Sequence, residues 1–151
     1  PKKKQGAIIG DMTRARRGAW RLAKTQIRPA VTQFFSASLK PGIRLFLLKP
    51  LTGKTHQIRV ALKSIGSPIL GDPLYHEQTD TPIDRTYLHA YSLSFPFQGE
   101  RYRFTCQPEV GELFDQDCRD LITEEYAEPW TLSWPRIQQH LPDGEDAGSR
   151  K

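Results

Sequence analysis

Acidic residues are almost missing from the first part of this sequence. Residues 1–63 contain 15 Lys and Arg but one acid, Asp11, which gives this part a net charge of +14. Residues 64–151 contain 7 basic and 16 acidic residues, a net charge of −9, so the whole chain carries +5. So large a difference within one chain favours a polyanionic partner over an evenly solvated surface. Because Trp20, Phe34 and Phe35 are interleaved with the basic residues, we expect a folded nucleic-acid-binding surface.

Cysteine and long apolar runs are scarce as well. Cys106 and Cys118 form no CxxC pair and have no His at zinc spacing, so the sequence predicts no metal site and two reduced thiols in a cytoplasmic protein. No apolar run approaches the roughly 20 residues that a membrane helix needs. The first residues also lack the charged and apolar pattern of a secretion signal. We therefore expect a soluble, cytoplasmic protein without a membrane partner.

The length of 151 residues leaves room for one hydrophobic core. Hydrophobic periodicity is lost after residue 122, so we expect the core in residues 1–122 and an extension in residues 123–151. Trp130 and Trp134 are candidates for docking that extension onto the core. We expect residues 143–151 to be disordered, because they combine polar residues with glycine and hold no aromatic residue.

Hydrophobic patterning predicts an α+β fold, built on a mainly antiparallel or mixed sheet with a few short helices. Residues 31–39 and 43–48 read as two strands joined at Pro41 and Gly42, and residues 87–97 and 101–106 form a second such hairpin. Apolar residues at helical spacing predict helices over residues 55–65, stopped by Gly66, and over residues 112–122. A short strand is predicted over residues 6–10 and an exposed basic loop or hairpin over residues 11–21.

The stretch from Leu51 to Arg59 concentrates polar side chains where the second predicted strand meets the first helix. Gly53, Lys54 and Thr55 match the end of a nucleotide phosphate loop, but that motif requires glycine at position 48, where this chain has Leu48. We reject the phosphate loop for that reason. Composition and spacing alone thus predict a basic α+β domain that binds RNA or DNA.

Three blocks, in this order, closely resemble the RluA-type RNA pseudouridine synthases. They are T-G-K-T-H-Q-I-R at residues 52–59, G-S-P-I-L-G-D-P-L-Y at residues 66–75 and L-H-A-Y-S-L-S-F at residues 88–95. The resemblance spans residues 31–108 and extends more weakly from Gly6. One departure is Ala61, where family members commonly have histidine.

The resemblance implies a pseudouridine-synthase-like fold and the isomerisation of uridine in ribosomal or transfer RNA. Such enzymes flip the target nucleotide into a pocket, break its glycosidic bond, rotate the uracil and rejoin it through carbon. An aspartate does the covalent or deprotonating work, with no metal or organic cofactor. DNA is not an expected partner, and the oligomeric state is left open.

The resemblance also implies roles for individual residues. By its place in the T-H-Q-I-R block, Arg59 corresponds to the family's ion-pair partner for the catalytic aspartate. That role suits an arginine, since its fork orients a carboxylate more rigidly than lysine does. A phosphate contact or plain surface charge is the alternative. Asp72 could instead cap a turn, and Tyr75 could instead be a packed ring, without a role in the pocket. For His89 we expect a structural hydrogen bond. The predicted RNA-binding residues are Lys54, His56, Arg14, Arg16, Arg17 and Lys63, and the predicted pocket-supporting residues are Thr55, Gln57, Asp72 and Tyr75.

Two of the family's blocks do not occur in these 151 residues: H-R-L-D, which carries the nucleophilic aspartate, and K-x-Y-x-A, which carries the active-site tyrosine. We therefore expect residues 1–122 to be the C-terminal portion of a catalytic domain that lacks its N-terminal part, and this chain alone to be inactive. Two alternatives stay open. One is a non-catalytic RNA-binding module on the same scaffold, and the other is an interaction domain that works through its acidic half.

Overall fold

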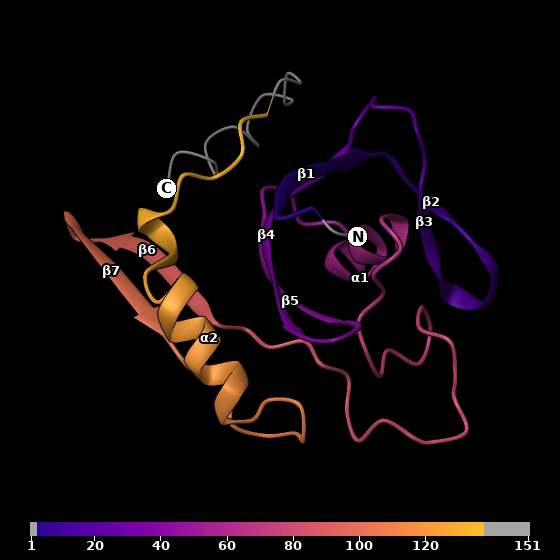
Figure 1. The fold of residues 1–151 in the computed structure, drawn as a ribbon. Coiled ribbons are helices and arrows are strands. Elements are labelled where there is room, and N and C mark those ends of the chain that lie inside the picture. Colours follow the sequence, from indigo (N-terminus) through magenta and orange to yellow (C-terminus); the bar gives the residue numbers. More distant parts are fainter. Residues whose placement is uncertain (1–2, 138–151) are drawn as a thin grey trace.

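The computed structural model describes residues 3–137 and has the predicted α+β architecture, with antiparallel sheets and short helices (Figure 1). A three-stranded sheet in the order β1-β4-β5 is accompanied by two two-stranded hairpins, β2-β3 and β6-β7. The elements in chain order are β1 Gln5–Gly10, β2 Met12–Arg14, the 3-10 turn η1 Arg16–Gly18, β3 Trp20–Leu22, β4 Ala30–Lys40, β5 Ile43–Pro50, α1 Gln57–Ser64, β6 Ser92–Phe97, β7 Glu100–Thr105, α2 Gln116–Tyr126 and η2 Pro129–Thr131.

The centre of the fold is β4, which pairs antiparallel with β1 on one side and β5 on the other. The turn between β4 and β5 has Pro41 before Gly42, whose φ of 78° is the positive value that a type II turn needs at this position. Both predicted strands therefore form the predicted hairpin.

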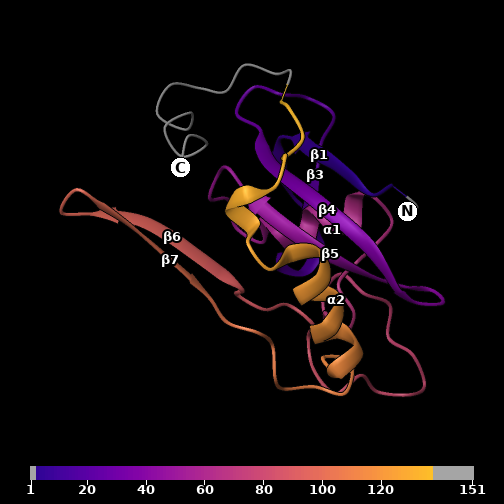
Figure 2. The ribbon, with the colours of Figure 1, turned by 60° about the vertical axis from the view of Figure 1, so that its left-hand side comes forward.

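Both faces of β4 are covered because successive side chains of a strand point to opposite sides. Phe34 is buried with Ile8 and Ala61 on the face that α1 covers. Its neighbour Phe35 lies on the opposite face, with its ring centroid 4.8 Å from that of Trp134. Figure 2 shows α2 crossing that opposite face, while β6 and β7 extend away from the sheet. This two-sided packing places α1 and α2 on different sides of the molecule.

Several predicted elements have different boundaries in the structure, and the reason is visible for three of them. The helix predicted over residues 55–65 is the shorter α1, because His56 adopts a left-handed conformation with φ 57° just before it. The helix predicted over residues 112–122 is α2, shifted toward the C-terminus because the Asp115 carboxylate caps the Cys118 N–H. Residues 87–91, predicted as strand, lie outside β6, and the Tyr87 N–H there donates to the Leu70 carbonyl instead of to a strand partner.

The predicted extension begins inside a regular element, since residue 122 lies within α2. Beyond α2, Trp134 packs on Phe35, and Gln33 Nε2 donates to the Pro135 carbonyl. The division of the chain at residue 122 stays a prediction. Residues 143–151, predicted to be disordered, lie outside the described residues.

Candidate functional site

The loop before α1 is held in place by one buried amide side chain, that of Gln57. Its Oε1 accepts hydrogen bonds from Thr52 Oγ1 at 2.7 Å and the Lys54 N–H at 3.0 Å. Its Nε2 donates to the Val31 carbonyl and to Thr32 Oγ1, both at 3.0 Å. Since Gln57 is only 6% exposed and its donors and acceptor are all used, it fixes the loop rigidly against β4.

Arg59 and Asp72 form a two-pronged ion pair beside this loop. Arg59 Nε and Nη2 donate to the two oxygens of the Asp72 carboxylate, each at 2.8 Å. Asp72 is fully buried, and its Oδ1 also accepts from the Leu74 and Tyr75 N–H groups. Planar fork geometry of this kind is specific to arginine.

The charges of this pair stabilise each other. Burial favours the protonated form of Asp72, but the hydrogen bonds from Arg59 and from the Leu74 and Tyr75 amides outweigh it and hold the pKa of Asp72 below its ordinary value. The hydrogen bond to Asp72 raises the pKa of Arg59. Both groups therefore stay ionised over the whole physiological range.

Tyr75 joins the loop to the hairpin of β2 and β3. Its hydroxyl accepts a hydrogen bond from the Trp20 N–H at 2.8 Å and lies 2.8 Å from His56 Nδ1. The Arg59 guanidinium stands over the Tyr75 ring, 5.0 Å from its centroid. Three segments that are far apart in sequence meet at this one side chain.

The structure brings some of the predicted site residues together and leaves others apart. His56, Gln57, Arg59, Asp72 and Tyr75 share the junction of the loop, α1 and the turn after it, with Lys54 and the exposed Thr55 in the same loop. Arg16 and Arg17 lie at the exposed tip of the β2–β3 hairpin. Lys63 is seven residues after His56, about 10 Å along the helix axis.

The structural roles considered for Asp72 and His89 are present in the structure. Asp72 caps the turn through the Leu74 and Tyr75 amides while it pairs with Arg59. His89 Nε2 lies 2.6 Å from the Cys106 carbonyl, which is a structural contact. For Arg59, the predicted pairing with an aspartate outside this chain stays a prediction, and two of its three nitrogen atoms already donate to Asp72.

A groove of about 1110 Å³ runs between β5 and α2 and is also lined by Trp130, Trp134 and two apolar residues of α1, Ile58 and Leu62. None of Lys54, His56, Arg59, Asp72 and Tyr75 lines it. Within residues 3–137 no three His, Cys, Asp or Glu side chains are grouped to hold a metal ion, and no helix there has the length and apolarity to cross a membrane. The candidate site is thus the polar junction at α1 rather than the groove.

Sequence reasoning missed the contacts that assemble this site. Nothing in the sequence linked Trp20 with Tyr75, because the two residues are 55 positions apart and meet only when the hairpin folds over α1. It also missed the use of Asp11, whose carboxylate accepts hydrogen bonds from Thr25 Oγ1 and from the Ile27 and Arg28 amides. One signal was available for Asp11: it is the single acid in a strongly basic stretch.

Comparison with known proteins finds relatives that are named RNA pseudouridine synthases. The chain is 58% identical over 114 residues to an uncharacterized RNA pseudouridine synthase of Haemophilus influenzae, which covers 76% of this chain and 50% of the relative. It is 37% identical over 97 residues to an uncharacterized RNA pseudouridine synthase of Zymomonas mobilis, which covers 62% of this chain and 44% of the relative. The chain thus spans half or less of the length of these curated relatives. No protein-family model matches it.

The fold is shared with a solved structure of the human RNA pseudouridylate synthase domain containing 1 protein. The TM-score is 0.61 at 22% sequence identity, over the whole of this chain and 62% of the human one. At this identity the likeness concerns the fold alone. Together with the two sequence blocks at residues 52–59 and 66–75, which meet at α1, these relatives fit an Rlu-type family of RNA pseudouridine synthases for this chain.

Proposed function

We propose that the protein to which this chain belongs isomerises uridine to pseudouridine in ribosomal or transfer RNA, in the cytoplasm and without a cofactor. The observation that carries this proposal is the 58% identity over 114 residues to a protein named as an RNA pseudouridine synthase. The geometry around α1 is compatible with it, because the most family-like residues form one rigid polar junction beside a basic hairpin.

Within this proposal, Arg59 orients a catalytic aspartate contributed from outside residues 1–151. Asp72 uses Nε and Nη2 of Arg59, and Nη1 makes no hydrogen bond within residues 3–137. Asp72 would then hold the guanidinium in a fixed plane, so that Nη1 can meet a second carboxylate. Thr55 and Gln57 support the pocket by shaping the loop.

Lys54, His56, Arg14, Arg16, Arg17 and Lys63 bind RNA in this proposal. Side chains of these types contact phosphates and position the RNA without reading its bases. The net charge of +14 on residues 1–63 supports the same role.

The chain by itself binds RNA but turns over no uridine, because the H-R-L-D block with its aspartate is not among its residues. The test is tritium release from RNA labelled at uridine C5, where the isomerisation exchanges hydrogen for the new carbon bond. This chain and the full encoded protein are assayed side by side. We expect release from the full protein only, and release by the short chain would refute its inactivity.

Arg59→Lys in the full protein tests the arginine itself. Lysine keeps the charge but loses the two-pronged contact, so we expect turnover to fall by more than about tenfold. Turnover per folded molecule equal to wild type would remove Arg59 from the active site and leave it as the structural partner of Asp72.

A second candidate is a non-catalytic RNA-binding module, and the Arg59–Asp72 pair is the observation that favours it. In that case the arginine of the T-H-Q-I-R block has a purely structural use inside this chain. The residues encoded before Pro1 decide between the two, since an H-R-L-D block there supports the enzyme and its absence supports the module.

A further inference from the structure

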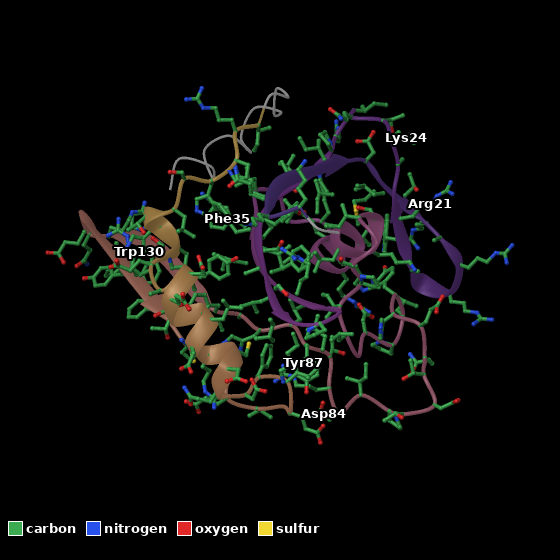
Figure 3. The ribbon with its side chains drawn as sticks, viewed as in Figure 1. Arg21, Lys24, Phe35, Asp84, Tyr87 and Trp130 are labelled. Atoms are coloured by element: carbon green, nitrogen blue, oxygen red, sulfur yellow. The ribbon has the colours of Figure 1, made fainter. Side chains whose placement is uncertain are left out.

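The hairpin of β2 and β3 and the loop after it form a positively charged projection, residues 11–28, which we name the basic arm. Its six cations are exposed, and none of them forms an ion pair with another residue of the range 3–137. Figure 3 shows two of them, Arg21 and Lys24, along the outer side of the molecule. The six are Arg14, Arg16, Arg17, Arg21, Lys24 and Arg28.

The one acid of the arm does not neutralise these cations. The Asp11 carboxylate accepts hydrogen bonds at the base of the arm, from Thr25 Oγ1 at 2.6 Å, the Ile27 N–H at 2.9 Å and the Arg28 N–H at 2.8 Å. These hydrogen bonds, that from Thr25 first, lower the pKa of Asp11. The hydrogen bonds of Asp11 thus fix the base of the arm. Its arginines are exposed, and Arg21 uses one donor, Nε, on Thr13 Oγ1 and keeps its other N–H donors for phosphate.

The arm meets the rest of the site through Trp20 and Leu22. Leu22 packs against the apolar cluster of Ile8, Phe34 and Ala61 beneath α1. The Trp20 N–H donates to the Tyr75 hydroxyl, which also contacts His56 Nδ1. Arg14 lies over the Trp20 ring, 5.2 Å from its centroid, so the charged end of β2 is tied to the same point.

The hydroxyl of Tyr75 is the polar part of this connection. Tyr75 is only 7% exposed, and a phenylalanine ring would fill the same space. What phenylalanine lacks is the oxygen that accepts from the arm and contacts the loop before α1. A non-directional apolar contact such as that of Leu22 holds the arm close, whereas a hydrogen bond sets its direction.

We propose that Tyr75 is a positioning residue for RNA: through Trp20 and His56 it sets the angle of the basic arm against the loop of residues 52–56. The arm and the loop then form one continuous RNA-binding surface. Arg16 and Arg17 hold phosphates at one end of it, and the RNA reaches Lys54 at the other. Tyr75 itself does not touch the RNA. The inference rests on the proposed function, in that it takes RNA as the partner.

The experiment measures binding of this chain to a synthetic RNA hairpin with a uridine-containing loop, at low and moderate salt. Tyr75→Phe removes only the oxygen, and we expect it to weaken binding about three- to tenfold, the range for one lost hydrogen bond. Tyr87→Phe is the matched control, because the Tyr87 hydroxyl also accepts from a backbone N–H, that of Leu113, and contacts one side chain, Asp84. Figure 3 shows Tyr87 and Asp84 away from the arm, and we expect this control to stay within about twofold of wild type.

A double-mutant cycle separates positioning from mere stability. If Tyr75 acts through the arm, adding Tyr75→Phe to the double variant Arg16→Gln/Arg17→Gln changes affinity by less than about twofold, because that variant lacks the two arginines whose phosphate contacts Tyr75 is proposed to position. An equal loss in both backgrounds would overturn the proposal. Amide hydrogen exchange at Trp20 gives a readout that is independent of RNA. We expect faster exchange in Tyr75→Phe but not in Tyr87→Phe, and unchanged exchange at Trp20 would overturn the proposal.

Different results would overturn the RNA partner and the positioning role of Tyr75. No binding of the RNA hairpin by the wild-type chain at low salt would overturn the proposed RNA partner, and the positioning role with it. Wild-type binding together with an unaltered Tyr75→Phe affinity would overturn the positioning role alone.

Discussion

At the scale of single residues, the site depends on a few buried polar side chains whose hydrogen bonds are all made. Gln57 joins the loop before α1 to β4, and Asp72 joins Arg59 to the turn at Leu74 and Tyr75. A buried polar group that loses its partner lowers the free energy of unfolding by far more than one hydrogen bond normally contributes to it. These residues therefore govern stability as well as any chemistry.

Removing Arg59 should destabilise the chain strongly. Arg59→Met leaves the Asp72 carboxylate buried with only two backbone donors, and we expect a loss of about 3 kcal/mol, at the lower end for a buried pair because Arg59 is partly exposed. Urea unfolding followed by circular dichroism measures it. The double variant Arg59→Met/Asp72→Leu should recover part of the loss, since it removes the orphaned charge, and a single-variant loss below about 0.5 kcal/mol would contradict the structure.

Acid should weaken the fold through Asp72. Its folded-state pKa lies below the ordinary value of 3.8, so the unfolded chain binds more protons at low pH. The stabilisation is present above about pH 4 and is lost as the pH falls through the lowered folded-state pKa. Asp11 and Asp115, whose pKa values are also lowered, act in the same direction. Unfolding free energies measured between pH 6 and pH 3 should fall less steeply for Asp72→Asn than for wild type, and parallel curves would argue against this.

At the scale of elements, short segments are placed by tight backbone turns and by packing on both faces of β4. The turn at Gly71 brings residues 69–75 back toward α1, where Asp72 meets Arg59. Tyr126, at the end of α2, is buried on the other face, and burial raises its pKa to about 12. The glycines at Gly66 and Gly71 both have positive φ, but their surroundings differ.

Alanine at these two glycines should therefore have unequal effects. At Gly71, with φ 80°, a Cβ would lie 1.8 Å from the Arg85 carbonyl oxygen, whereas at Gly66, with φ 77°, nothing lies within 4 Å. We expect Gly66→Ala to cost about 1 kcal/mol, from the backbone conformation alone. Gly71→Ala should cost at least twice as much, because the turn has to shift. Thermal unfolding of the two variants compares them directly, and equal losses would contradict the close approach at Arg85.

At the scale of the whole molecule, the basic arm and α2 differ in charge and lie on different sides of the sheet (Figure 1). The basic arm and α1 lie on one side, and α2, with a single basic residue, on the other. A polyanion is attracted to the first side and repelled by the second, which orients it before any specific contact forms. We expect this separation to appear in the salt dependence of RNA binding.

Neutralising two arginines of the arm should lower that dependence by a defined amount. If Arg16 and Arg17 each neutralise one phosphate, the slope of log affinity against log salt should become shallower by about 1.4 to 1.8 in Arg16→Gln/Arg17→Gln. Arg101→Gln/Arg103→Gln on β7 is the control with the same loss of charge, and it should leave the slope near that of wild type. A similar change in both double variants would show that binding follows net charge rather than the arm.

The sequence predicted the sheet better than the site. The β4–β5 hairpin was predictable because alternation and the Pro41–Gly42 turn are local signals. The start of α2 was misplaced, because the cap at Asp115 competes with an apolar pattern that begins earlier. The partner of Arg59 was not predictable from local signals, since Asp72 lies 13 residues away across a turn that only Gly71 makes possible.

By itself, the sequence determined the division of charge, the α+β class and the three blocks that resemble the family, because composition, periodicity and motif order do not depend on three-dimensional contacts. The tertiary structure decided which of those residues meet. Arg59 reaches Asp72, and Trp20 reaches Tyr75, only because β4 holds the basic hairpin and α1 on the same side of the sheet. Hydrogen bonds act over about 3 Å, so partners distant in sequence can be assigned only after the chain has folded.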